Sequence, residues 1–262
     1  MHALSTCFLA LYLAHLVTDF ILQSDHLVTQ KKSGSPLAYA EHGGIHLLAA
    51  ILFLGFALPG LWTRPGFYAF TIALTLTHLV MDWAKLRLIA SGRIDDGATS
   101  FLTDQALHLL TVFATAWLIA RPSLLNVTTT IRSFQLQIEK PLLLLVIYSG
   151  VIFGGGYVVR LVTKPLLKND LRALGETTSE LQNAGMYIGW LERFVVLTAL
   201  VLQSPATVGL ILTAKAIARY PELKSVRFAE YFLIGTLLSL TLGILGGLIL
   251  LKGLYGTVTL SK

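Results

Sequence analysis

The sequence predicts an all-α protein that crosses a membrane about eight times. Of its 262 residues, 55% are hydrophobic and only 13% are charged, and the mean hydropathy is +0.71. These values exceed what a soluble domain needs to fill its core. The apolar residues form continuous, leucine-rich runs close to the roughly 20 residues that a helix needs to cross a bilayer. They do not alternate with polar residues, as the strands of an outer-membrane barrel would.

The apolar runs divide the chain into three regions. Residues 1–120 hold four expected spans, residues 121–140 form a long connection, and residues 141–262 form a C-terminal helical region. We expect the first region to be a four-helix bundle that carries a polar site, and the connection to contain a short interfacial strand. The expected spans are 3–23, 37–60, 67–90, 101–120, 141–163, 184–203, 205–220 and 228–255.

The basic residues predict how the chain is oriented. The net charge of +6 is spread through short loops, whereas a nucleic-acid site requires clustered charge, so we expect no nucleic-acid partner. If both termini lie outside, most of the 20 Lys and Arg residues fall in cytoplasmic loops, as the positive-inside rule requires. The first run carries His15 and Asp19 where a signal peptide is uniformly apolar, and we expect it to be retained. Cys7 is the only cysteine, which excludes an intramolecular disulfide.

Each expected span of the first region carries two ionisable side chains one helical turn apart. Residues at i and i+4 lie on the same face of a helix, and ionisable groups inside a span are costly enough to suggest function. The orientation places all four pairs in the cytoplasmic half of the membrane, so we expect them to form one site. The pairs are His15 with Asp19, His42 with His46, His78 with Asp82, and Asp104 with His108.

These residue types favour a divalent transition metal. Imidazole and carboxylate are ligands of zinc and manganese, and eight donors are too many for one tetrahedral zinc. They fit two metals bridged by a carboxylate, as in two-metal hydrolases. Two alternatives stay open: hydrogen bonds between neighbouring helices, and a proton or metal-ion pathway in a transporter or channel.

The favoured function is hydrolysis by a membrane-bound, metal-dependent enzyme. A metal-activated water would attack a phosphoester or related bond of an amphiphilic substrate, and membrane lipid is the expected surrounding partner. Gln23 and Gln105 are expected to orient the substrate or a ligand, and Lys85 to offset developing negative charge.

The C-terminal region carries a second group of charged residues. It contains Glu192, Arg193, Lys215, Arg219 and Glu230. One interpretation is buried ion pairing of Glu192 with Lys215 or Arg219. The other is a basic pocket for the phosphate of a lipid headgroup. The Gly154–Gly156 run lacks the strand and turn of a phosphate-binding loop, and we expect it to pack or kink a helix.

The motifs of the first region resemble a known family. The segment from His15 to Gln23, with Lys31 and Lys32 downstream, resembles domain-of-unknown-function family 3307, a family of bacterial inner-membrane proteins. The resemblance continues through the pairs up to Asp104 and His108, covers about the first 120 residues, and implies a bacterial inner membrane but no activity. More distantly, the paired histidines are similar to those of membrane-bound metal-dependent hydrolases.

Overall fold

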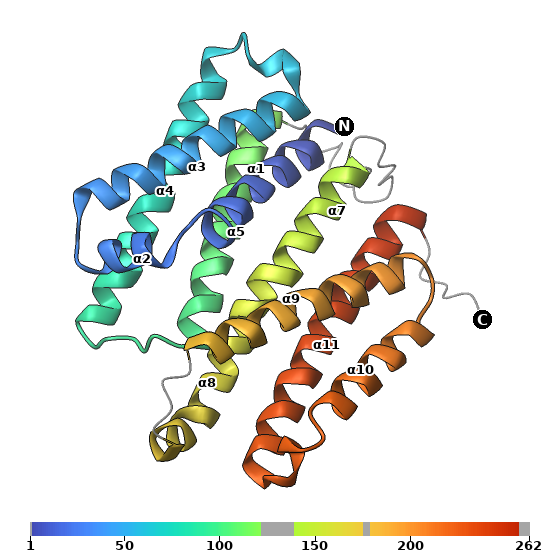
Figure 1. Ribbon diagram of the computed structural model, residues 1–262. Helices are drawn as coiled ribbons and strands as arrows, with labels where there is room; N and C mark the ends of the chain where they lie inside the picture. Colours follow the sequence, from blue (N-terminus) through green and yellow to red (C-terminus); the bar gives the residue numbers. More distant parts are fainter. Residues whose placement is uncertain (1, 122–138, 175–178, 257–262) are drawn as a thin grey trace. The chain divides into compact units, whose positions relative to one another are not determined.

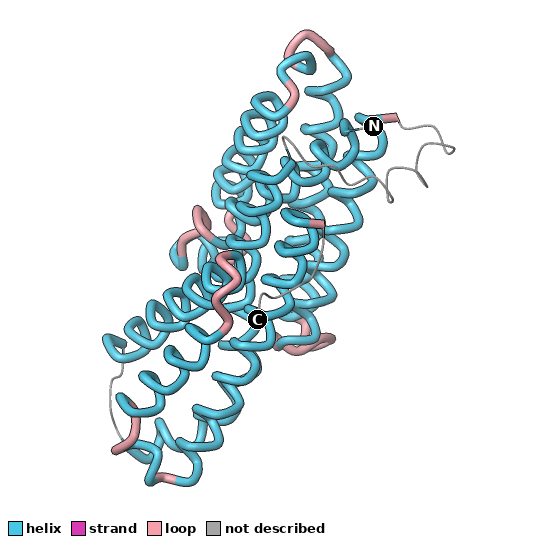
Figure 2. The backbone as a smooth tube through the Cα atoms, turned by 90° about the vertical axis from the view of Figure 1, so that its right-hand side faces the viewer, coloured by secondary structure: helices cyan, strands magenta, loops and turns pink. Residues whose placement is uncertain are grey.

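The protein is helical throughout the part that the structure describes. The computed structural model describes the backbone of residues 2–121, 139–174 and 179–256, and side chains in 3–121, 139–166 and 185–256. Figure 2 shows helices joined by short loops, and no strand occurs in these ranges. The interfacial strand expected within 121–140 falls mostly outside them. The chain forms two compact units, Met1–Val146 and Ile147–Lys262, so the division lies beyond residue 120, where the first region was expected to end.

The first unit is built from long apolar helices and one short polar one (Figure 1). The long helices are α1 (His2–Phe20), α3 (Pro36–Ala57), α4 (Pro65–Ala90) and α5 (Ala98–Ala120), and the short one is α2 (Asp25–Lys32). Local sequence sets several boundaries. The Ser24 and Ser35 side chains cap the starts of α2 and α3 by accepting backbone N–H groups. Gly34 adopts a φ of 80° between them, a conformation that favours glycine.

The four long helices of the first unit pack as neighbouring pairs. Helix α1 contacts α3 and α5, and α4 also contacts α3 and α5. Away from the polar pairs they share an apolar core that includes Leu11, Leu54, Phe67 and Val112. Helix α2 lies against α3 and α4. The start of α7 (Glu139–Ser149) is hydrogen-bonded to α1. The hydroxyl groups of Ser5 and Thr6 donate to the buried Glu139 carboxylate.

The second unit continues α7 through a π-helical turn at Gly150–Gly154 into α8 (Gly155–Leu174). It then adds α9 (Ser179–Val201), α10 (Ala206–Ala218) and α11 (Val226–Tyr255). Helix α11 packs against α8 and α9, and α10 packs against α9. The glycine run was expected to pack or kink a helix, and it does lie in close contact with its neighbours: a Cβ on Gly155 would come within 3.3 Å of Leu242.

Six helical segments in the described residues are long and apolar enough to cross a membrane, so the expected eight spans are too many. They are Ala3–Phe20, Pro36–Ala57, Pro65–Ala90, Ala98–Ala120, Glu139–Leu166 and Val226–Tyr255. The expected seventh span corresponds to α10, whose 13 residues reach about 20 Å and fall short of the roughly 30 Å hydrocarbon core. The expected sixth corresponds to α9, whose side chains are described only from residue 185, and it is not among the six found in the described residues.

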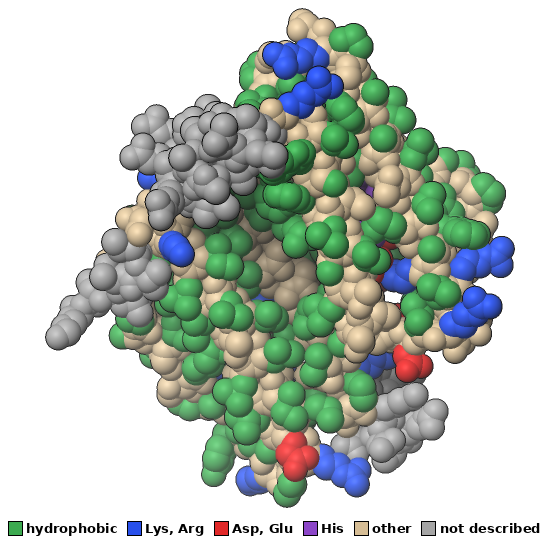
Figure 3. Space-filling view, turned by 180° about the vertical axis from the view of Figure 1, so that it is seen from behind, with side chains coloured by type: hydrophobic (Ala, Val, Ile, Leu, Met, Phe, Trp, Pro, Cys, Tyr) green, Lys and Arg blue, Asp and Glu red, His purple; other side chains and the backbone are tan. Residues whose placement is uncertain are grey.

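The surface fits a multi-pass membrane protein. Large apolar side chains such as Leu37, Phe56 and Val80 are exposed on the long helices. In Figure 3 hydrophobic side chains cover much of the visible face, and Lys and Arg gather near its margins. Such an extensive exposed apolar surface is unusual for a soluble protein but expected where lipid covers it.

Candidate metal centre

The eight paired donors of the first unit lie close together inside it. Helices α1, α3, α4 and α5 each present one pair, and the five imidazoles are 0–1% exposed. The Asp19 side chain is the most accessible of the eight, at 11%. Because each pair is spaced by four residues, both members face inward from the same side of their helix. The donors are His15, Asp19, His42, His46, His78, Asp82, Asp104 and His108.

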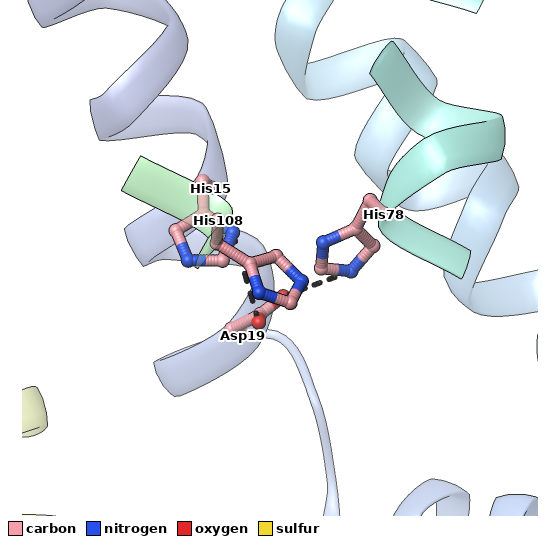
Figure 4. A group of neighbouring side chains, drawn as sticks. All are labelled: His15, Asp19, His78 and His108. Atoms are coloured by element: carbon pink, nitrogen blue, oxygen red, sulfur yellow. Dashed lines mark ion pairs between the residues drawn. The ribbon is translucent and has the colours of Figure 1, made fainter. Parts of the chain in front are cut away.

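The Asp19 carboxylate reaches histidines from three helices. Its Oδ1 lies 3.4 Å from Nε2 of His78 and 3.5 Å from Nε2 of His42, and its Oδ2 lies 3.7 Å from Nδ1 of His15. Figure 4 shows Asp19 with His15, His78 and His108, which converge from α1, α4 and α5. The carboxylate therefore links separate imidazoles through its two oxygens.

Asp82 has a similar bridging position. Its Oδ2 lies 3.7 Å from Nε2 of His42 and 3.9 Å from Nε2 of His78, while its Oδ1 lies 3.8 Å from Nε2 of His108. Two ligands held at about 2.1 Å from a tetrahedral zinc would stand about 3.4 Å apart. The nitrogen-to-oxygen distances around Asp19 and Asp82 start at this value and exceed it by up to half an ångström. The two shortest, from Asp19 to His78 and His42, lie at the long limit for a hydrogen bond, and the others exceed it.

Hydrogen bonds fix which nitrogen of two histidines carries the proton. Nδ1 of His108 donates to the backbone carbonyl of Asp104 at 2.9 Å, since a carbonyl only accepts. Nε2 of His15 donates to the Gln105 side-chain oxygen at 3.3 Å. In the neutral imidazoles the other nitrogens, Nε2 of His108 and Nδ1 of His15, bear lone pairs. Both are buried without a hydrogen-bond partner and face the Asp82 and Asp19 carboxylates.

Three overlapping sets of donors could each hold a metal ion. In each set, one ligand atom per residue lies within 4.8 Å of the others. His46 belongs to none of these sets among the described residues; its Nδ1 lies 3.1 Å from the Thr75 hydroxyl and its ring stacks on His78. The sets are His15, Asp19, His78 and His108; His42, His78 and Asp82; and Asp82, Asp104 and His108.

Of the three residues expected to assist catalysis, Lys85 and Gln105 contact the donors directly and Gln23 is connected to them through Lys31. Nζ of Lys85 donates to Oδ2 of Asp104 at 2.6 Å. The Gln105 amide connects two donors, because its oxygen accepts from His15 and its nitrogen lies 3.3 Å from Oδ2 of Asp104. Gln23 accepts from Lys31 at 2.6 Å. Their contacts fit orientation of ligands, and their roles in catalysis stay predictions.

Lys31 is the residue that sequence reasoning missed. No role in the site was expected for it from the sequence, yet it is only 4% exposed and its Nζ lies 2.6 Å from Oδ2 of Asp82. One signal was available: Leu27 and Lys31 are four residues apart on α2 and are the two buried residues of that helix. The contact with Asp82, 51 positions away, depends on tertiary packing.

Two lysines change the charge of the cluster. Asp19, Asp82 and Asp104 contribute three negative charges, and Lys31 and Lys85 contribute two positive ones. With neutral histidines the cluster carries a net charge of −1. One divalent cation would bring it to +1 and two would bring it to +3, which is costly in a buried site.

The second charged group divides into separate contacts. Glu192 pairs with Lys215 at 2.7 Å. Lys215 is one of the two partners that were expected for Glu192. Arg219 pairs instead with Glu222 at 3.2 Å, near the surface, at the C-terminal end of α10. Glu230 is exposed at the start of α11. The five residues therefore do not converge as one basic pocket.

Arg193 is buried and held by neutral groups. Its Nε and one terminal nitrogen donate to the backbone carbonyl of Ile152, at 3.1 and 2.9 Å, and the other terminal nitrogen donates to the Ser239 hydroxyl at 3.2 Å. Ile152 lies in the π-helical turn. A Cβ on Gly156 would come within 2.6 Å of the guanidinium. The glycine run thus makes room for Arg193.

Comparison with known proteins places the chain in one family. No curated protein and no solved structure matches it, so the distant similarity to membrane-bound hydrolases stays a prediction. The sequence profile described as protein of unknown function DUF3307 matches residues 7–137, which include all eight paired donors. The chain belongs to the DUF3307 family of proteins of unknown function.

Proposed function

We propose that the protein is a metal-dependent hydrolase of the bacterial inner membrane that acts on a phosphoester or related bond of an amphiphilic substrate. One observation supports a bound metal. The lone-pair nitrogen of His15 lies 3.7 Å from an Asp19 oxygen, and that of His108 lies 3.8 Å from an Asp82 oxygen. Both atoms of each contact are acceptors, so a cation between them would turn repulsion into binding. Zinc and manganese fit a ligand set of imidazoles and carboxylates.

The charge of the cluster favours one metal over two. The set with the most donors, His15, Asp19, His78 and His108, offers four possible ligands from three helices. A catalytic zinc needs three protein ligands and keeps the fourth position for water. Asp82 would then remain with Lys31. A second divalent cation becomes favourable only with an anion, such as a substrate phosphate, to offset its charge.

The chain's own residues would bind and orient the substrate at the side where Lys85 lies. A bound divalent cation lowers the pKa of water toward neutrality and polarises a phosphoryl oxygen. Lys85 is 26% exposed while it donates to Asp104, so its ammonium can reach a phosphate and still touch the cluster. Gln105 would hold the His15 ring in its orientation. An amphiphile could place its phosphate here and its chains in the lipid.

The burial of the donors favours a second candidate, a proton- or metal-ion-coupled transporter or channel. The five imidazoles are 0–1% exposed, and their rings follow one another at short separations. Ring centroids of His46 and His78 lie 4.3 Å apart, those of His78 and His108 4.5 Å, and those of His108 and His15 4.8 Å. A small ion passes such a cluster more easily than a phosphoester does.

Two assays on the purified full-length chain separate the candidates. A synthetic phosphoester amphiphile in mixed micelles should be hydrolysed by the wild type, with loss of activity on chelation and recovery with zinc or manganese. Asp19→Asn should lose about 100-fold or more in rate, since it removes the charged ligand of the proposed four-donor set. Metal-loaded protein that hydrolyses no such substrate but carries protons or zinc across proteoliposomes would establish the transporter instead.

A further inference from the structure

Helix α2 is fastened to the donor cluster through one buried lysine. Nζ of Lys31 donates to Oδ2 of Asp82 and to the Gln23 side-chain oxygen, both at 2.6 Å. A lysine that is 4% exposed requires such partners, because an unpaired buried ammonium is costly. The ammonium therefore neutralises one carboxylate of the cluster and anchors α2 at the same time.

The oxygen that binds Lys31 is also one that faces two histidines. Oδ2 of Asp82 lies 3.7 Å from Nε2 of His42 and 3.9 Å from Nε2 of His78, and these three residues form one of the candidate metal sets. A metal that takes Oδ2 as a ligand would stand near the ammonium. Two cations cannot share one buried carboxylate oxygen without strong repulsion.

We propose that Lys31 is an internal competitor for metal at the His42, His78 and Asp82 set, and that metal binding at this set releases Lys31 and with it α2. This inference rests on the proposed metal centre and assigns Lys31 the role of a positioning residue that limits metal affinity. While Lys31 holds Asp82, metal is directed to the set that contains Asp19. Displacement of Lys31 opens the second set.

Few contacts hold α2 against the rest of the first unit, so the whole helix could detach at once. Besides Lys31, only Leu27 is buried in this helix, and the neighbouring Lys32 pairs with Asp96 where both side chains are about half exposed. Gly34 follows at a φ of 80° and marks a turn between α2 and α3. Exposed ion pairs contribute little, so Lys31 and Leu27 supply most of what fixes the helix in place.

Metal binding by Lys31→Met, with Lys32→Met as the matched control, tests the competition. Lys31→Met keeps the apolar stem and removes the ammonium. We expect it to bind zinc about 10–100-fold more tightly at the Asp82 set, the range by which groups next to ligands alter metal affinity, or to gain a second equivalent. Lys32→Met should match the wild type. Wild type that binds zinc while Lys31→Met binds it equally or more weakly would overturn the inference and leave the metal centre standing.

Limited proteolysis of the wild type provides a test without substitution. Trypsin cleaves after Lys31 and Lys32 only when α2 opens locally. We expect saturating zinc to speed cleavage there, relative to protein held in chelator. Slower or unchanged cleavage on zinc binding would contradict release of α2. If neither wild type nor variants bind metal in titration, the proposed metal centre and this inference both fail.

Discussion

At the scale of single residues, the hydrogen bonds of two histidines determine what the cluster can bind. A histidine that donates one ring N–H to a carbonyl or amide oxygen keeps a lone pair on the other nitrogen. His108 and His15 both do so, toward Asp104 and Gln105, and their free nitrogens face carboxylates. Hydrogen bonds between helices account for His42 with His78 and for His46 with Thr75, but they leave these two nitrogens of His15 and His108 without a partner.

In the second unit, a single residue, Arg193, is expected to contribute to the stability of the protein. Arg193→Met leaves the buried Ile152 carbonyl without its donors, which should cost about 1–3 kcal/mol and lower the melting temperature in detergent. Arg219→Met is the control, since its exposed pair with Glu222 is worth about 0.5 kcal/mol or less. Metal content should be unchanged in both variants. A fully stable Arg193→Met protein would show that the carbonyl finds another donor.

At the scale of helices, close approach of α3 and α4 brings His42 to His78, whose Nε2 atoms lie 2.9 Å apart. The sequence suggests that Gly43 and Gly44 both allow close packing, but the two differ. A Cβ on Gly43 would lie 2.7 Å from Cδ1 of Leu79 on α4, whereas a Cβ on Gly44 meets nothing within 4 Å. Only Gly43 faces the neighbouring helix.

This difference predicts opposite effects of the same substitution at adjacent positions. Gly43→Leu should destabilise the protein by about 1–3 kcal/mol through overpacking and weaken metal binding by separating His42 from His78. Gly44→Leu should be neutral or slightly stabilising, because leucine has the higher helix propensity. Thermal melts and metal titration of the two variants provide the measurement. Equal destabilisation would mean that helix approach does not depend on Gly43.

The sequence predicts features that depend on neighbouring residues, and it does not predict contacts between segments that lie far apart along the chain. Spacing of four residues within one apolar helix is a local property, so the His78 and Asp82 pair was visible. Two contacts join distant segments: Lys31 donates to Asp82, and Arg193 donates to the Ile152 carbonyl. No local pattern encodes either contact. Helix α10 is apolar, but it begins after Pro205 and ends at Ala218, and its 13 residues are too few to cross a bilayer.

At the scale of the whole molecule, six candidate spans are an even number and keep both termini on one side, as eight would. The positive-inside rule predicts that side to be outside. Reporter fusions after Gly34 and Arg93 should therefore read as cytoplasmic, and a fusion after Lys140 as periplasmic. A fusion after Gln203 should read as periplasmic only if α9 crosses the membrane despite Glu192 and Arg193. A reversed pattern at the first three points would place the donor cluster in the periplasmic half.

Metal content of the purified full-length chain tests the central claim most directly. Elemental analysis of wild type, purified without chelators, should find about one zinc or manganese per chain, and His15→Ala, Asp19→Asn and His108→Ala should each lose most of it. The reason is that each variant removes one donor from the set of His15, Asp19, His78 and His108, and the ligands themselves contribute most of the metal affinity. Lys32→Met, outside the cluster, should keep wild-type content. Wild-type protein without metal, or three variants with unchanged stoichiometry, would contradict the account.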